Sequence, residues 1–89
     1  MTRPLSDLTV LVTGGGRGLG AAIVRAFARE GARVAINYRH SKTEADALAA
    51  SLGPRAAAFR ADVTNAAQVA AMMAEITRTL GRPDVLVHN

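Results

Sequence analysis

Residues 8–20 read Leu-Thr-Val-Leu-Val-Thr-Gly-Gly-Gly-Arg-Gly-Leu-Gly, and this stretch decides the fold. Its apolar start, residues 8–13, is typical of a strand that is buried on both faces, as in a parallel sheet. Glycines then end the strand, and residues 18–30 have the pattern of a helix that stops at Gly31. A buried strand that leads through a glycine-rich turn into a helix is a known way to bind a nucleotide pyrophosphate.

The rest of the chain alternates between strands and helices. We expect strands over residues 33–37, 56–61 and 84–89, and helices over residues 41–52 and 66–80. Ser41 and Glu44 have the spacing of a capping box, and Thr64 or Asn65 can cap the last helix. Helical spacing predicts two apolar stripes, one of Leu19, Ile23, Ala26 and Phe27, the other of Val69, Met73, Ile76 and Leu80. This alternation predicts one α/β domain with a parallel sheet.

Composition narrows the class of protein. Of the 89 residues, 49% are hydrophobic and 20% are charged, which is typical of a globular chain. The net charge of +4 comes from scattered arginines, and aromatic residues make up 3%. A nucleic-acid surface would need clustered basic residues with stacking aromatics, so we expect no nucleic-acid partner. The chain has no cysteine and no apolar run of membrane-spanning length, so we expect a cytoplasmic protein with no membrane partner.

Three glycines have distinct expected tasks. Gly14 allows a sharp turn after the strand, Gly18 lets the backbone approach a phosphate, and Gly20 lets the helix pack closely on the strand. A Walker-type loop is excluded, because no Gly-Lys-Ser/Thr follows. The alternative is a flexible turn without a ligand.

The end of the second strand indicates which dinucleotide is preferred. An NAD site normally has a carboxylate about 20 residues after the glycines, to bind the ribose 2′-hydroxyl. Here the sequence is Ile36-Asn37-Tyr38-Arg39, without an acid. Arg39, with Arg17 from the glycine turn, can instead pair with a 2′-phosphate, which favours NADP(H) over NAD(H). The alternative is that Arg39 is a solvated loop charge.

Three motifs together resemble the classical short-chain dehydrogenases/reductases. Thr13-Gly14-x-x-x-Gly18-x-Gly20 is similar to the family's glycine motif, and Asp62-Val63 to its adenine-contacting pair. Residues 84–89 resemble the strand that leads into the family's Asn-Asn-Ala-Gly motif, with His88 in place of the first asparagine. The sequence is also similar to the 3-oxoacyl-carrier-protein reductase branch of this family. The family's fold is Rossmann-type with three layers, and this chain would supply its strands in the order 3-2-1-4.

The resemblance implies roles for individual residues. Gly14, Arg17, Gly18 and Leu19 would line the phosphates, next to Thr13 and Gly20 of the same motif. Tyr38 and Arg39 would border the adenosine ribose. Asp62 and Val63 would hold the adenine edge, and Asn89 would lie near the adenine-side ribose.

Catalytic residues are not expected in this sequence. In the family, a serine, an asparagine and a Tyr-x-x-x-Lys pair act in positions after residue 89. Tyr38 and Lys42 have this spacing by chance, at the adenosine end of the cofactor and across the predicted helix start, so we reject them as catalytic. His40 and His88 have no partners at metal-ligand spacing, so we expect no metal site.

The resemblance predicts a truncated doubly wound fold. The fourth strand would be an open edge, and one face of the sheet would keep an exposed apolar patch, favouring self-association or a partner. The leading prediction is the cofactor-binding part of an NADP(H)-dependent oxidoreductase that is inactive by itself. The alternative is a stand-alone nucleotide-binding or regulatory module that a partner chain completes.

Overall fold

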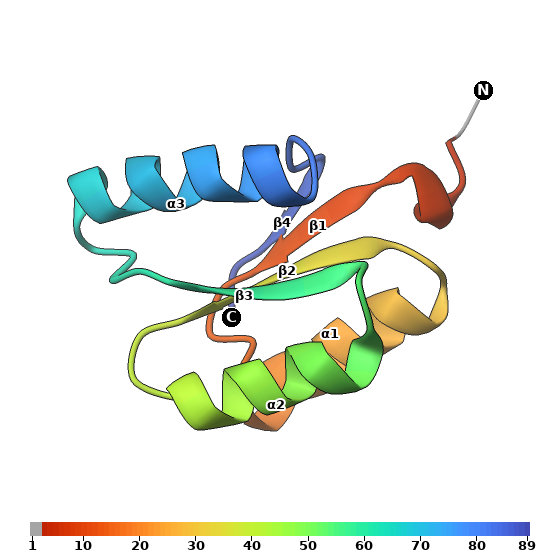
Figure 1. Cartoon of the computed structure of the whole chain (residues 1–89), viewed down its shortest axis with the longest axis horizontal. Coiled ribbons are helices and arrows are strands. Elements are labelled where there is room, and N and C mark those ends of the chain that lie inside the picture. The colour runs from red at the N-terminus through yellow and green to blue at the C-terminus, as the bar shows by residue number, and fades with distance from the viewer. Residues whose placement is uncertain (1–2) are drawn as a thin grey trace.

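A parallel sheet of four strands forms the middle layer of the protein in the computed structural model, which describes residues 3–89 (Figure 1). The strands are β1 (Thr9–Val12), β2 (Arg33–Tyr38), β3 (Ala56–Arg60) and β4 (Val85–Val87). Their order is β3-β2-β1-β4, which confirms the predicted order. In the register of the sheet, Val10 of β1 lies between Val34 of β2 and Val85 of β4.

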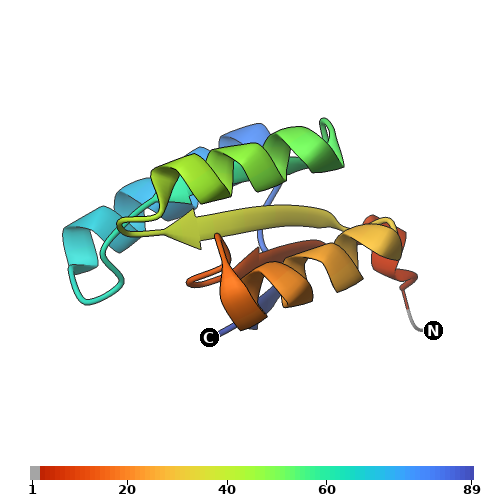
Figure 2. The ribbon, with the colours of Figure 1, turned by 90° about the horizontal axis from the view of Figure 1, so that it is seen from below.

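Helices cover both faces of the sheet. The helices α1 (Gly18–Arg29) and α2 (Lys42–Leu52) lie side by side on one face, and α3 (Ala66–Thr79) lies on the other (Figures 1 and 2). A short 3-10 helix, η1 (Leu5–Asp7), precedes β1. None of the helices in the described part of the chain is long and apolar enough to cross a membrane.

The core consists of one apolar cluster on each face. Val10, Val12, Val34 and Ile36 face α1 and α2, whereas Leu11 and Ala35 face α3. Successive residues of a strand point to opposite faces, so a central strand covered on both sides is mostly apolar. All four residues of β1 are buried, which explains why its sequence was the strongest structural signal.

The apolar stripes of the helices agree with the prediction only in part. In α1, Ile23 and Phe27 of the predicted stripe pack partly buried against the core, whereas Leu19 is 70% exposed and Ala21 and Val24 are buried. In α3, Ile76 of the predicted stripe is buried, as is Leu80 just after the helix, while Met72 is buried and the predicted Met73 only partly so. Apolar spacing alone does not distinguish the buried residue from an apolar neighbour on the next position of the helix.

The two predicted helix caps have different outcomes. Asn65 caps α3, because its side chain accepts a hydrogen bond of 3.0 Å from the backbone N–H of Gln68. The predicted capping box at Ser41 is wrong: Ser41 is the N-cap residue of α2 but makes no side-chain cap bond. Its ψ of 50° departs from the extended backbone that a capping serine normally adopts.

The fourth strand is shorter than expected and forms one edge of the sheet. It covers Val85–Val87 rather than residues 84–89, and Leu86 is 62% exposed. A hollow of about 490 Å³ lies beside it, against α3, and is lined mainly by apolar side chains, among them Val69, Met72 and Met73. An apolar hollow is therefore present on the face where the sequence predicted an exposed patch.

Candidate functional site

The turn between β1 and α1 presents the start of a helix at the carboxyl ends of the strands. Gly14 and Gly18 have φ values of +60° and +62°, in the left-handed region that glycine adopts without strain. Arg17 is the N-cap residue but makes no side-chain cap bond, and the first turn of α1 contains no acidic residue. The first N–H groups of a helix have no partners within the helix, and they attract anions. This helix start can therefore receive an anion such as a phosphate.

Gly18 and Gly20 have different surroundings. A Cβ atom on Gly18 would meet no atom within 4 Å. A Cβ on Gly20 would lie 2.1 Å from the carbonyl oxygen of Gly14 and 2.7 Å from Nδ2 of Asn89. Gly20 is thus required by close packing of the protein itself, whereas the space beside Gly18 is open.

The two residues that follow β4 contact the glycine turn. The backbone N–H of Asn89 donates to Oγ1 of Thr13 over 3.0 Å, and Nδ2 of Asn89 donates to the Gly14 carbonyl over 3.1 Å. His88 replaces an asparagine of the motif, and its Nδ1 lies 3.4 Å from the same Thr13 oxygen. Thr13, Gly14 and Asn89, three of the predicted site residues, are therefore in direct contact.

Asn37 is a site residue that sequence reasoning missed. Its side chain is buried, with the residue 3% exposed at the end of β2. Its Oδ1 accepts from the N–H of Gly14 over 3.3 Å, its Nδ2 donates to the Ala61 carbonyl over 3.1 Å, and its own carbonyl accepts from the N–H of Gly15 over 2.9 Å. Asn37 thus connects the glycine turn to the segment after β3. A polar residue at the end of an otherwise apolar strand was the available signal.

Arg39 and Asp62 form an ion pair across the ends of β2 and β3. Nη2 of Arg39 lies 3.1 Å from Oδ2 of Asp62, with 58% of the arginine side chain and 20% of the aspartate side chain exposed. The hydroxyl and the backbone N–H of Thr64 both donate to Oδ1 of Asp62, over 2.6 and 2.9 Å. These two bonds, followed by the charges of Arg39 and Arg60, hold the pKa of the Asp62 carboxyl below its usual value.

The other predicted residues are placed as follows. Leu19 and Val63 are exposed, while Tyr38 belongs to the core beneath α1 and α2 and is 7% exposed. Lys42 is exposed and pairs with Asp46, which raises the pKa of the Lys42 ammonium group. A hollow of about 420 Å³ lies between the glycine turn and α2, with Arg17, Arg25 and Glu44 on its walls.

Comparison with known proteins identifies the family. The model of the short chain dehydrogenase family matches residues 8–89. The chain belongs to this family. Two similar curated proteins are hydroxynaphthalene reductase of Aspergillus fumigatus and sorbitol dehydrogenase of Cereibacter sphaeroides, each 44% identical over 97% and 96% of this chain. The chain spans about a third of their length, 33% in both cases.

Solved structures of the family superpose well. The FolM alternative dihydrofolate reductase 1 of Brucella canis, complexed with NADP, is 30% identical with a TM-score of 0.87, over 97% of this chain and 35% of its own. A blue fluorescent protein from a metagenomic library, in complex with NADPH, is 43% identical with a TM-score of 0.86, over 94% and 36%. The Rossmann-type arrangement of a short-chain dehydrogenase is therefore confirmed, and both of these neighbours were solved with a bound NADP or NADPH.

Proposed function

We propose that these 89 residues form the cofactor-binding part of an NADP(H)-dependent short-chain oxidoreductase. The observation that carries the preference for NADP(H) is the end of β2. Arg39 is exposed there, and none of residues 37–40 has a carboxylate. A carboxylate there would bind the ribose 2′-hydroxyl and repel a 2′-phosphate. An arginine has the opposite effect, because its planar guanidinium matches the geometry of phosphate oxygens.

The chain's residues fit a pyrophosphate at the glycine turn. The open space beside Gly18 and the N-terminus of α1, with no acid in its first turn, would receive the phosphates. Arg17 would add a positive charge from the same turn. Asp62 and Val63 would hold the adenine edge, and Asn89 would lie near the ribose. Arg39 would supply the side-chain contact at the adenosine ribose, because the neighbouring Tyr38 ring packs in the core.

The reaction itself would need residues outside this sequence. When bound, the nicotinamide supplies or accepts a hydride at a carbonyl or alcohol carbon. Tyr38 and Lys42 would take no part, since the tyrosine is buried and the lysine is held by Asp46. We therefore propose that residues 1–89 alone do not turn over a substrate. Membership of the 3-oxoacyl-carrier-protein reductase branch and a cytoplasmic location stay predictions.

Two nucleotide titrations test this function. The chain would be titrated with NADPH and with NADH, and nucleotide fluorescence would report binding. We expect tighter binding of NADPH and a loss of that preference in Arg39→Asp. Arg29→Asp, at the far end of α1, is the matched control and should keep the preference. Equal affinities of the two nucleotides in the unchanged chain would contradict the proposed preference.

A second candidate function rests on the open edge of the sheet. Exposed Leu86 and the apolar hollow beside β4 favour a nucleotide-binding module that a partner chain completes. Light scattering of the purified chain, with and without NADPH, tests this alternative. A stable assembly that Leu86→Lys disrupts would support it, and a monomer at high concentration would contradict it.

A further inference from the structure

The carboxylate of Asp62 is held in a fixed orientation. Thr64 donates twice to Oδ1, from its hydroxyl and from its backbone N–H. Two bonds from one neighbouring residue leave little rotational freedom to the carboxylate plane. The other oxygen, Oδ2, consequently points toward the end of β2, where it meets Nη2 of Arg39 at 3.1 Å.

Arg39 would otherwise be a mobile side chain. More than half of it is exposed, at 58%, and an exposed arginine has many rotamers that must be restricted when it binds a ligand. The ion pair engages Nη2, and the guanidinium has further N–H donors on Nε and Nη1. A carboxylate that holds one edge of the guanidinium therefore leaves the other edge able to donate to a phosphate.

We propose that Thr64 and Asp62 are positioning residues, which hold Arg39 in the orientation that receives the ribose 2′-phosphate. This inference rests on the proposed function and extends it, because selection of the 2′-phosphate then depends on three side chains from two loops. Asp62 lies in the segment after β3 and Arg39 follows β2, so the pair also connects the adenine side of the site to the phosphate side.

The alternative is that Asp62 weakens binding of the 2′-phosphate, and the test distinguishes the two effects by the direction in which the affinity changes. A negative charge beside Arg39 could compete with the phosphate, so that its removal would strengthen binding. Two features favour positioning. The charge on Oδ1 is engaged by the Thr64 donors, and Arg60 adds a second positive charge near the carboxylate.

The test compares two small ligands that differ in the 2′-phosphate, adenosine 2′,5′-bisphosphate and adenosine 5′-monophosphate. Their affinities would be measured by calorimetry, and the ratio of affinities isolates the 2′-phosphate from the adenine contact. Thr64→Val removes the hydroxyl donor, and Thr64→Ser keeps it. Thr77→Val is the matched control, because the Thr77 hydroxyl donates to the Met73 carbonyl at the other end of α3.

We expect the unchanged chain to prefer the bisphosphate, and Thr64→Val to lower the affinity ratio roughly two- to fivefold, the scale of a surface ion pair. Thr64→Ser and Thr77→Val should keep the ratio. A ratio that stays the same or rises in Thr64→Val would overturn the inference, including the case in which both affinities fall equally because the loop is disturbed. If the unchanged chain does not prefer the bisphosphate, the proposed function fails first and the inference fails with it.

Discussion

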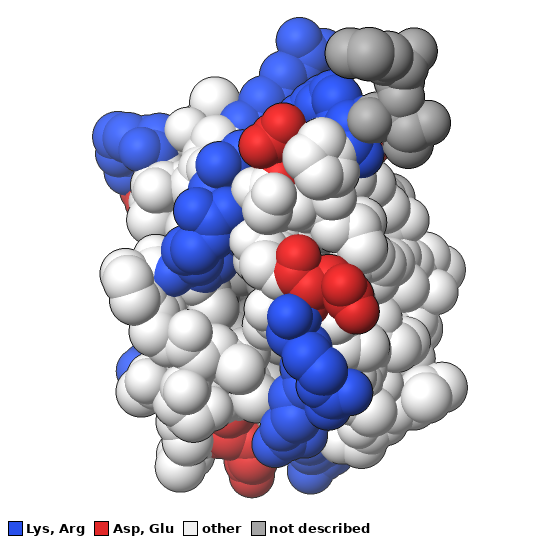
Figure 3. All heavy atoms as spheres, turned by 90° about the vertical axis from the view of Figure 1, so that its right-hand side faces the viewer, with Lys and Arg blue, Asp and Glu red and all other residues white. Residues whose placement is uncertain are grey.

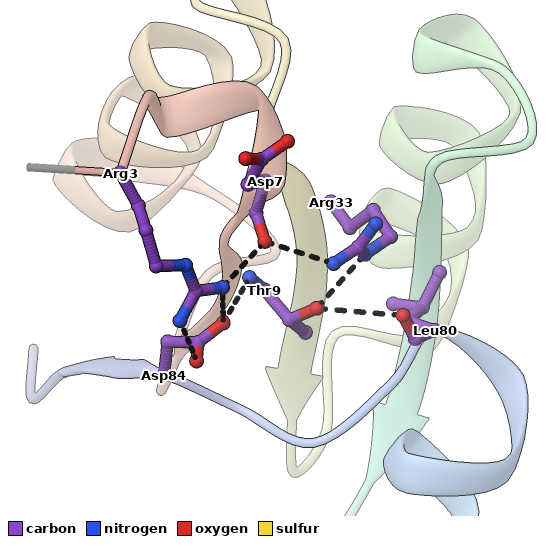
Figure 4. A network of polar contacts seen from close by, with 6 residues as sticks. All are labelled: Arg3, Asp7, Thr9, Arg33, Leu80 and Asp84. Atoms are coloured by element: carbon purple, nitrogen blue, oxygen red, sulfur yellow. Dashed lines mark hydrogen bonds and ion pairs between the residues drawn. The ribbon is translucent and has the colours of Figure 1, made fainter.

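The arginines at the two ends of the sheet have different surroundings. At the amino ends of the strands, Arg3 pairs with Asp84, Arg33 donates to Oγ1 of Thr9, and both donate to the Asp7 carbonyl (Figure 4). At the carboxyl ends, Arg17 makes no side-chain cap bond at the start of α1, and Arg39 pairs with Asp62 while 58% of its side chain is exposed, against 57% for Arg3. At the amino end the arginines connect η1, β1, β2 and Asp84, whereas at the carboxyl end Arg17 and Arg39 lie at the proposed cofactor site.

These arginine contacts explain why the net charge of the chain alone indicates little about which partners it binds. Figure 3 views the end of the molecule that carries the N-terminal segment, and basic side chains spread over it with acidic ones between them. Several of these arginines serve the fold: Arg55, for example, donates to the carbonyls of Gly31 and Ser6. A basic surface whose donors are engaged by the protein's own carbonyl groups has fewer of them to offer to an anion.

The largest expected effect concerns the glycine turn at the carboxyl end. Gly20→Ala places a Cβ 2.1 Å from the Gly14 carbonyl oxygen, so we expect a loss of about 3 kcal/mol in the free energy of unfolding. The Cβ of Gly18→Ala would contact no atom within 4 Å, and the cost comes only from the left-handed backbone at this position. We therefore expect a loss of about 1 kcal/mol in the free energy of unfolding. Urea unfolding of both variants measures the difference. Equal losses would contradict the distinction between a packing glycine and an open one.

The next effect concerns the polar support beneath that turn. Asn37→Ala leaves the partly buried N–H of Gly14 and the buried Ala61 carbonyl without this side chain, and we expect a loss of about 2 kcal/mol. Asn65→Ala is a matched control that removes one exposed cap bond, for which about 1 kcal/mol is expected. Urea unfolding provides the test. A smaller loss for Asn37→Ala than for the control would show that Asn37 is not a central contact.

A smaller effect is expected from a pair of variants that compares the amino end of the sheet with the carboxyl end. Arg33→Ala removes donors to Thr9 and to the Asp7 carbonyl at the amino end, so we expect a loss of about 1 kcal/mol in unfolding free energy and no change in nucleotide affinity. Arg39→Ala should change nucleotide affinity and leave stability within about 0.5 kcal/mol. Unfolding and titration of both variants would be run in parallel. If each variant changed both stability and nucleotide affinity, the proposed difference in role between the two ends of the sheet would be wrong.

The smallest effect is a dependence of stability on pH. The backbone N–H of Thr9 and the side chain of Arg3 hold the pKa of the Asp84 carboxyl below its ordinary value of 3.8. A lowered pKa in the folded state stabilises the fold above the ordinary pKa, and this contribution disappears as the pH falls through the folded value. We expect Asp84→Asn to be less stable than the unchanged chain at pH 7, with a difference that shrinks in acid.

Unfolding between pH 2 and pH 7 measures that difference. Asp7→Asn is the control, because the contacts of Asp7 with Arg3 and Arg33 are made by its backbone carbonyl. A difference for Asp84→Asn that is constant over this range would exclude the proposed linkage.

The sequence was sufficient for the architecture but not for all contacts of the site. The alternation of apolar strands and helices predicted the parallel sheet, since burial on both faces leaves few other patterns. The capping box at Ser41 failed because a cap depends on the backbone angle, which the spacing of two residues does not determine. The sequence predicts Arg39 and Asp62 as separate site residues, but it does not predict their ion pair. The two residues are 23 positions apart and meet because β2 and β3 are neighbours in the sheet.

The most direct test of the account is the ratio of NADPH to NADH affinity in the unchanged chain and in Arg39→Asp. A carboxylate at this position would repel the 2′-phosphate and bind the ribose hydroxyl. We predict that the unchanged chain binds NADPH at least about tenfold more tightly, a difference of about 1.4 kcal/mol, and that Arg39→Asp abolishes or reverses the preference. Tighter binding of NADH by the unchanged chain, or a preference that survives Arg39→Asp, would contradict the account.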